Sequence, residues 1–143
     1  MRSRASRSIS YALFLVALLV LLIGCAARPA PAQQLRVVNA SGAAIVGLTV
    51  LFPGSTSASE ALRVEFGDLP PGTTTDYREV QGGVYRYAAY SYSSGGQTIT
   101  QSVTDWVGER PMTGSRFTYR IAVDPKLPPG GQIQLLEAVV DAP

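Results

Sequence analysis

Few side chains in this chain of 143 residues could carry chemistry. There is no histidine, which excludes histidine-based triads, histidine general bases and histidine metal ligands. Asp105 and Glu109 flank Trp106, and glycoside hydrolysis requires two carboxylates at a set separation across a cleft. We expect a protein that is not an enzyme. A small carbohydrate-active or hydrolase-like domain that uses Asp105 and Glu109 near Trp106 is the alternative.

Other acidic residues lie in or near expected turns, namely Asp68, Asp76 and Asp124. None belongs to an Asp-x-Asp-x-Asp calcium loop, and Asp side chains commonly brace turns by accepting hydrogen bonds from nearby backbone. The sequence therefore predicts bracing carboxylates, with no metal site and no cofactor.

The single cysteine, Cys25, cannot form an intrachain disulfide. It ends a segment with the layout of an export signal, in which Arg2, Arg4 and Arg7 precede an uncharged run over residues 8–27. The tetrapeptide Leu22-Ile23-Gly24-Cys25 resembles the bacterial lipobox. The resemblance implies that Cys25 receives a diacylglyceryl group and that the lipoprotein signal peptidase, recognising Leu22, Ile23 and Gly24, cleaves before it.

Two other interpretations of this segment stay open. The uncharged run is long enough for a retained membrane anchor, because a spanning helix needs roughly 17–25 residues. The second open interpretation is ordinary secretion. Two acyl chains suffice for stable attachment, so lipidation predicts a membrane-anchored, extracytoplasmic protein of the cell envelope. Ala26 is not acidic, which resembles lipoproteins sent to the outer membrane where a bacterium has two membranes.

We expect three parts: a lipoprotein signal peptide with a signal helix over residues 1–24, the lipidated Cys25 with a Pro/Ala tether over 25–33, and a folded domain over 34–143. Without the three arginines of the signal, nine basic side chains remain against ten acidic ones, a net charge of −1. Nucleic-acid binding requires a clustered basic surface, so we do not expect nucleic acid as a partner.

The expected domain is rich in segments that alternate with period two. Arg116, Thr118 and Arg120 alternate with apolar residues up to Val123, and residues 62–66 alternate equally well. Val46, Leu48, Val50 and Phe52 are expected to share one face of a strand. Further strands are expected from Leu35 and Val37 and over residues 73–80, 84–92, 97–103 and 132–140. Glycine- and proline-rich turns separate them, among them a hairpin turn at Ser94-Gly95-Gly96.

Aromatic residues are the candidate ligand contacts, although packing in the core is the favoured interpretation for them. Tyr85 and Tyr87 should lie on one face of their strand, and Tyr90 and Tyr92 on the other. Exposed aromatic rings can stack on sugars, whereas buried ones fill the core. Trp106 is either a ligand contact or a plug at the end of the core.

The stretch over residues 64–73 (Val64-Glu65-Phe66-Gly67-Asp68-Leu69-Pro70-Pro71-Gly72-Thr73), followed by Gly82-Gly83-Val84-Tyr85, resembles exported immunoglobulin-like sandwich domains of uncharacterised function in bacteria. Together with the pattern of strands and turns it predicts an all-β, antiparallel, immunoglobulin-like sandwich of seven or eight short strands. We expect a binding or envelope-support role for it, with the membrane, an envelope protein or a glycan as partner.

Overall fold

The computed structural model describes residues 32–53, 62–102 and 108–142. Within these ranges the regular elements are strands and no helix occurs, so the predicted all-β fold is confirmed. The strands are β1 (Gln33–Asn39), β2 (Ile45–Phe52), β3 (Leu62–Leu69), β4 (Arg78–Val80), β5 (Ala89–Ser94), β6 (Gln97–Gln101), β7 (Arg116–Val123) and β8 (Ile133–Val140).

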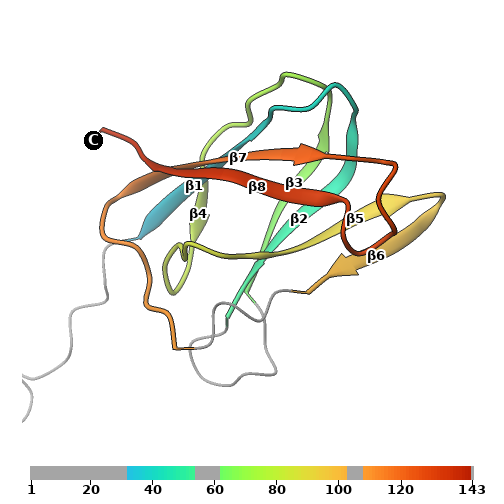
Figure 1. Ribbon diagram of the computed structural model, residues 1–143. Helices are drawn as coiled ribbons and strands as arrows, with labels where there is room; N and C mark the ends of the chain where they lie inside the picture. Colours follow the sequence, from blue (N-terminus) through green and yellow to red (C-terminus); the bar gives the residue numbers. More distant parts are fainter. Residues whose placement is uncertain (1–31, 54–61, 103–107, 143) are drawn as a thin grey trace, which may run out of the picture. The chain divides into compact units, whose positions relative to one another are not determined.

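These strands form two four-stranded sheets, which Figure 1 shows as two layers. The order in the first sheet is β4-β1-β7-β8, and in the second β3-β2-β5-β6. Strands β1 and β7 run parallel, whereas the other pairs in the described residues are antiparallel. The first sheet is therefore mixed rather than purely antiparallel as expected. The parallel pair arises because the chain visits the second sheet between β1 and β7 and returns in the same direction.

Alternating side chains from the two sheets meet in one shared core. The ring of Phe52 on β2 contacts that of Tyr119 on β7 edge-on, with centroids 6.1 Å apart. The first sheet contributes the buried residues Leu35, Val37, Val80, Phe117, Tyr119, Ile121 and Ile133, and the second contributes Leu48, Val50, Phe52, Val64, Phe66, Tyr90 and Tyr92. Removing these apolar surfaces from water is the main force that holds the sheets face to face.

The expected face of β2 is wrong at one position. Leu48, Val50 and Phe52 are fully buried, but Val46 is exposed and Ile45 takes the buried place before Leu48. The pairing of β2 with both neighbours shifts register around Gly47, whose φ is 62°. A β-bulge of this kind inserts an extra residue, so the side chains before it change face.

The expected strand over residues 84–92 is wrong in its first half. Strand β5 begins only at Ala89, which pairs with Leu51 of β2. Before it, the backbone N–H of Val84 donates to Oε1 of Gln33 at 2.6 Å, and the carbonyl of Val84 accepts from the N–H of Met112 at 2.7 Å. The backbone of Val84 therefore bonds to a side chain and a loop rather than to a sheet. The hairpin turn at Gly95 and Gly96 is confirmed, since it joins β5 to β6 and both glycines have the positive φ of a tight hairpin.

Side-chain amides join segments that lie far apart in the sequence. Gln33 donates from Nε2 to the carbonyls of Met112 and Gly114 at 2.8 and 2.9 Å, while its Oε1 accepts from Val84. Gln101 on β6 donates to the carbonyl of Ile133 at 2.6 Å and accepts from the N–H of the same residue at 3.0 Å. Because Ile133 begins β8, Gln101 connects the edge of the second sheet to the edge of the first.

Candidate binding surfaces

Several residues singled out in the sequence lie outside the described residues. These are Leu22, Ile23, Gly24 and Cys25 of the lipobox-like tetrapeptide, together with Asp105 and Trp106. Within the residues that the structure describes, there is no helix of the length and apolar character that crossing a membrane requires.

The four tyrosines named above as candidate ligand contacts separate into two groups. Tyr90 and Tyr92 on β5 are buried in the core, with 2% and 3% of their surface exposed. Tyr85 and Tyr87 precede the strand and are half-buried. The ring of Tyr85 packs against Phe52 with centroids 6.2 Å apart. Tyr87 lines a surface hollow described below, so of the four tyrosines it is the one that a ligand can reach most directly.

The hydroxyl groups of the buried tyrosines have different partners. That of Tyr119 donates to the carbonyl oxygen of Tyr85, and that of Tyr92 accepts from the N–H of Gly130 at 3.2 Å. The hydroxyl of Tyr90 has no hydrogen-bond partner among the described residues. Burial raises the pKa of Tyr90 and of Tyr119 far above the ordinary value, and the neighbouring Tyr90 raises that of Tyr119 further.

The acidic residues do not converge on a site within the described ranges. Asp124 accepts from the N–H of Lys126 at 2.9 Å, which confirms that it braces its own turn. Asp68 instead accepts from the N–H of Gly47 at 2.8 Å, and so holds the bulge of β2. Glu109 is exposed. No group of three metal-binding side chains gathers in the described part of the chain.

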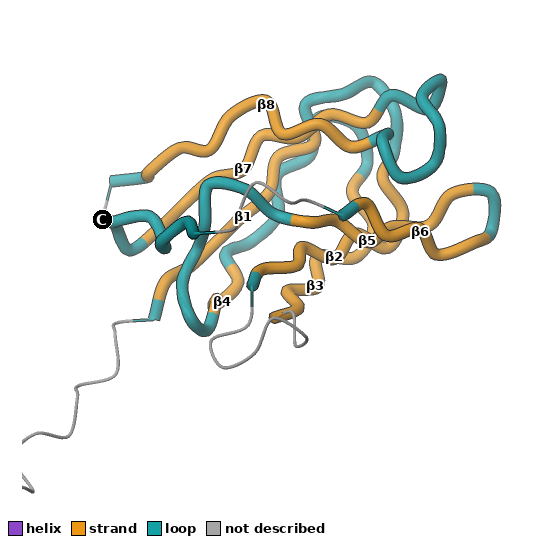
Figure 2. Tube along the Cα trace, turned by 60° about the horizontal axis from the view of Figure 1, so that its bottom comes forward, coloured by secondary structure: helices purple, strands orange, loops and turns teal. Residues whose placement is uncertain are grey.

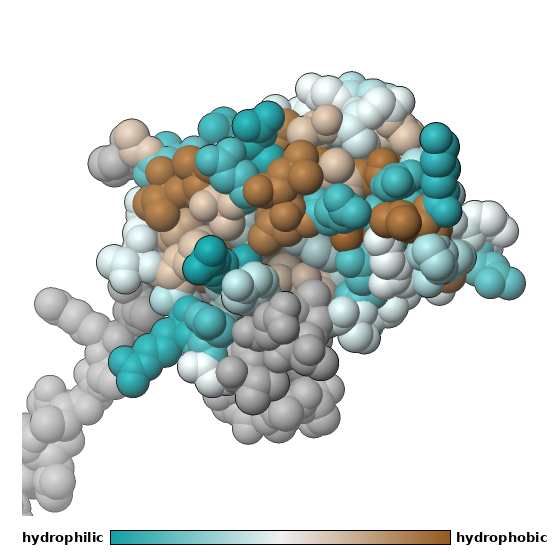
Figure 3. Space-filling model, viewed as in Figure 1, coloured by the Kyte–Doolittle hydropathy of each residue, from teal (hydrophilic) through white to brown (hydrophobic). Residues whose placement is uncertain are grey.

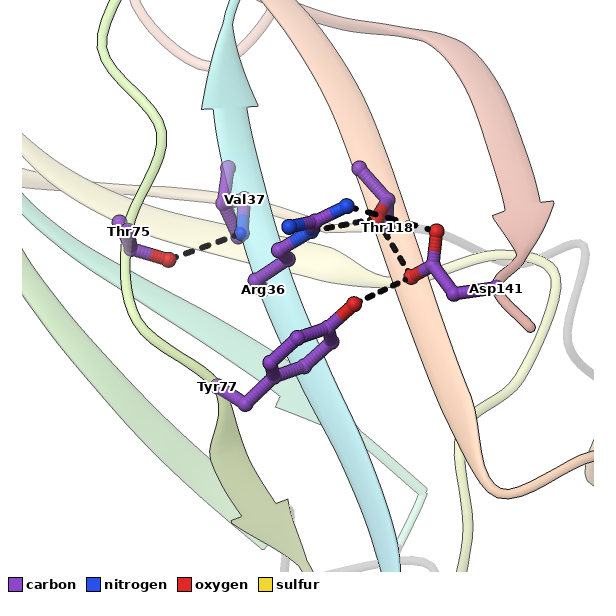
Figure 4. A network of polar contacts seen from close by, with 6 residues as sticks. All are labelled: Arg36, Val37, Thr75, Tyr77, Thr118 and Asp141. Carbon is purple, nitrogen blue, oxygen red and sulfur yellow. Dashed lines mark hydrogen bonds and ion pairs between the residues drawn. The ribbon is translucent and has the colours of Figure 1, made fainter. Parts of the chain in front are cut away.

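A polar network covers the outer face of the first sheet (Figure 4). Asp141, just beyond β8, accepts from the hydroxyls of Thr118 and Tyr77 at 2.6 and 2.9 Å, and pairs with Arg36 at 3.5 Å. Arg36 also donates from Nε to the hydroxyl of Thr118 at 2.8 Å. Because these donors and acceptors satisfy one another, the network ties β1, β7 and the segments before β4 and after β8 together.

Tyr77 lies at the centre of this network. The guanidinium carbons of Arg36 and Arg116 lie 4.8 and 5.4 Å from the centroid of its ring, a distance typical of cation–π contacts. Partial desolvation, together with the hydrogen bond to and the charge of Asp141, raises the pKa of the Tyr77 hydroxyl. The hydroxyl therefore stays protonated at neutral pH and acts as a donor to Asp141.

A hollow of about 420 Å³ opens beside β8. Its lining combines apolar side chains with one charge of each sign: Arg86, Tyr87, Met112, Leu135, Leu136, Glu137 and Ala138. The guanidinium carbon of Arg86 lies 5.7 Å from the centroid of the Tyr87 ring. In Figure 3, hydrophobic side chains are exposed on the side of the molecule where β8 runs. A concave surface that combines apolar and polar groups can accommodate a side chain or a small ring.

Sequence reasoning identified Tyr87 but not the rest of this hollow. Met112 lies in a loop without periodicity, and Leu135 and Leu136 were expected only within a closing strand. The two consecutive leucines are the one signal in the sequence, because a strand with one solvated face does not normally carry large apolar side chains at successive positions.

Comparisons with protein-family models, with curated proteins and with solved structures find no match to this chain.

Proposed function

We propose that this chain is a bacterial lipoprotein whose β-sandwich binds or supports other components of the cell envelope, without catalysis. The observation that carries the proposal is the position of the single cysteine. Cys25 follows Leu22-Ile23-Gly24 at the end of an uncharged run that three arginines precede. A diacylglyceryl group on Cys25 supplies two acyl chains, and two chains anchor a protein stably to a membrane.

The described surface supports binding rather than catalysis. The outer polar network consists of groups that satisfy one another, so it presents no hydroxyl aligned with a free general base. The hollow beside β8 is lined by apolar and polar groups together, the charged ones being Arg86 and Glu137. These features favour recognition of a protein segment, or of a sugar ring that stacks on Tyr87.

We also propose that the sandwich is of the immunoglobulin-like type. The support is that each sheet contains neighbours that are not consecutive in the sequence, β1 beside β7 and β2 beside β5, so connections cross between the sheets. Such crossing connections are typical of Greek-key sandwiches.

The proposed location is the extracytoplasmic face of a membrane, and the outer membrane where the bacterium has two.

Lipid labelling directly tests the proposal that Cys25 is lipidated. Cells that express the full chain are grown with radiolabelled palmitate, and the protein is immunoprecipitated. We expect label in the wild-type protein and none in Cys25→Ala. An Ala27→Ser variant, changed two positions beyond the cysteine, is the matched control and should keep its label. A wild-type protein without label would reject the proposal.

A further inference from the structure

Strand β8 presents a free edge with exposed apolar side chains. It pairs with β7 on one side, and no described strand lies on its other side, as Figure 2 shows. Leu136 and Val140 are 54% and 53% exposed, and they are two of the three large apolar residues described as exposed. We call residues 136–140 the β8 edge. Exposed edges of this kind template pairing with another strand.

The other three edges carry features that discourage pairing. Strand β4 has only three residues, and β6 exposes polar side chains at Gln97, Thr98 and Thr100. Strand β3 exposes Arg63 and Glu65. Short strands and charged side chains are the usual protection of an edge. On strand β8, Gln101 bonds both backbone groups of Ile133, and the pairing with β7 has a bulge at Leu136. The part of the edge that remains for pairing is residues 136–140, where the single charge, Glu137, pairs with Arg120 of β7 at 3.4 Å.

We propose that the β8 edge pairs antiparallel with the same edge of a second copy of this chain, about a two-fold axis through Ala138. In such a pair, residues that face each other share one face of the joined sheet. A two-fold axis perpendicular to the sheet keeps the inner faces of both copies on the same side. The axis must therefore pass through a residue position, because neighbouring residues point to opposite faces.

Charge excludes two of the registers that satisfy this condition. An axis through Glu137 would place the two Glu137 carboxylates opposite each other. An axis through Val139 would place Glu137 opposite Asp141 of the second copy. Like charges directly opposite each other on a sheet are destabilising. An axis through Ala138 avoids both clashes, because Glu137 then faces Val139.

The same register matches the exposed apolar residues. Leu136 and Val140 lie two positions on either side of Ala138, so Leu136 of each copy faces Val140 of the other. Ala138 faces itself, where its small side chain allows close approach. Leu136 also lines the hollow with Tyr87 and Met112, so Val140 of the second copy lies beside the mouth of that hollow. An edge that faces itself without a clash of charges and with matched apolar side chains favours a second copy over an unrelated strand.

Cysteine scanning of the purified full-length protein tests this register, and the test does not depend on the proposed lipid anchor. Residues 136–140 are replaced one at a time by Cys, and the protein is oxidised and analysed on non-reducing gels. Residues that face each other lie about 4.5–5.5 Å apart between Cα atoms, within the range of a disulfide. Leu136 lies about 13 Å from Leu136 of the second copy, too far for one.

We expect Ala138→Cys to give a covalent dimer several-fold more abundant than that of any other single variant. Leu136→Cys and Val140→Cys should each form little covalent dimer alone, but they should cross-link to each other when differently tagged copies of the two variants are mixed. Both sites are exposed enough for the substitution not to affect folding. The protein without an added cysteine is the control for any dimer band that arises from Cys25 itself. Val46→Cys, an exposed apolar residue on β2, measures random collision.

Three outcomes would overturn the proposal. One is dimer formation no higher than that of Val46→Cys at every position of the edge. Another is a maximum at Glu137→Cys or Val139→Cys, which would mean a different register. The third is failure of the mixed Leu136→Cys and Val140→Cys copies to cross-link.

Discussion

The side-chain amide of Asn39 donates a hydrogen bond to the carbonyl oxygen of Leu69 at 3.0 Å, and so joins the end of β1 in one sheet to the end of β3 in the other. The same nitrogen is 2.8 Å from the carbonyl of Ala43, while Oδ1 accepts from the hydroxyl of Ser41 at 2.6 Å. Asn39 is fully buried. One residue thus satisfies the polar backbone at a corner where three segments meet.

Replacing Asn39 with Ala should lower the free energy of unfolding by about 1–3 kcal/mol. The reason is that the buried carbonyl of Leu69 would lose the donor that Asn39 supplies, whereas the carbonyl of Ala43 keeps the Ser41 hydroxyl at 3.1 Å. Urea denaturation of the full-length protein in mild detergent, followed by far-ultraviolet circular dichroism, measures the change. Gln97→Ala, an exposed amide on β6, is the control. A loss no larger than that of the control would contradict the structural role of Asn39.

The hydroxyl groups of Tyr90 and Tyr119 should respond in opposite ways to removal. Tyr90→Phe is expected to leave the stability unchanged or raise it by about 1 kcal/mol, because a buried hydroxyl without a partner is unfavourable. Tyr119→Phe should lower it by about 1–3 kcal/mol, because the carbonyl of Tyr85 loses its donor. The same urea titration compares the two variants, which remove the same atom from the same core. Equal changes in the free energy of unfolding for the two variants would contradict this prediction, because the hydrogen bond of the Tyr119 hydroxyl would then not contribute to stability.

The two buried tyrosines also predict instability at alkaline pH. Burial raises the pKa of both above the ordinary value of 10.0. A group whose pKa is higher in the folded state contributes stability that is complete below the pKa of the unfolded state and is lost as the pH rises beyond it. Stability should therefore fall above about pH 10. A titration that records tyrosinate absorbance and circular dichroism together should show the last tyrosines ionising only as the structure unfolds. Ionisation of every tyrosine in the folded protein would contradict this.

Gly83 should not tolerate a side chain. A Cβ there would lie 2.6 Å from Cβ of Pro111, and φ is +100°. Gly83→Ala is expected to cost about 2–4 kcal/mol, from overpacking and backbone strain together. Two glycines separate these causes: Gly72 has a φ of +71° with open space around it, and Gly42 has open space without a positive φ. Thermal unfolding should show the smallest fall in Tm for Gly42→Ala, a larger fall for Gly72→Ala and the largest for Gly83→Ala. A Gly83→Ala variant no worse than Gly72→Ala would contradict the packing against Pro111.

Local patterns were sufficient to predict the strands that are held by regular pairing. The alternation of Arg116, Thr118 and Arg120 with apolar residues marks β7 within the boundaries that the structure shows. Period two predicts such a strand because successive side chains point to opposite faces. It fails at Val46, where the bulge at Gly47 changes the face, and at Val84, whose backbone is bonded by Gln33 and Met112 instead of a strand.

The surfaces were harder to predict, because they depend on contacts between residues far apart in the sequence. Tyr77 and Asp141 are 64 positions apart, and no local pattern indicates that they meet. The hollow likewise combines Tyr87 with Met112 and the β8 residues Leu135 and Leu136. The outward position of Thr118 could be predicted from alternation, but its partner Arg36 follows only from the parallel pairing of β1 with β7.

The most direct test of the proposed lipoprotein is the intact mass of the protein purified from the membranes of its host, measured beside a Cys25→Ala variant. We predict a chain that begins at Cys25 and carries the added mass of acyl chains, and a variant that carries no such addition. A full-length, unmodified mass for the wild-type protein would contradict the account, and residues 8–27 would then have to be interpreted as a retained membrane anchor.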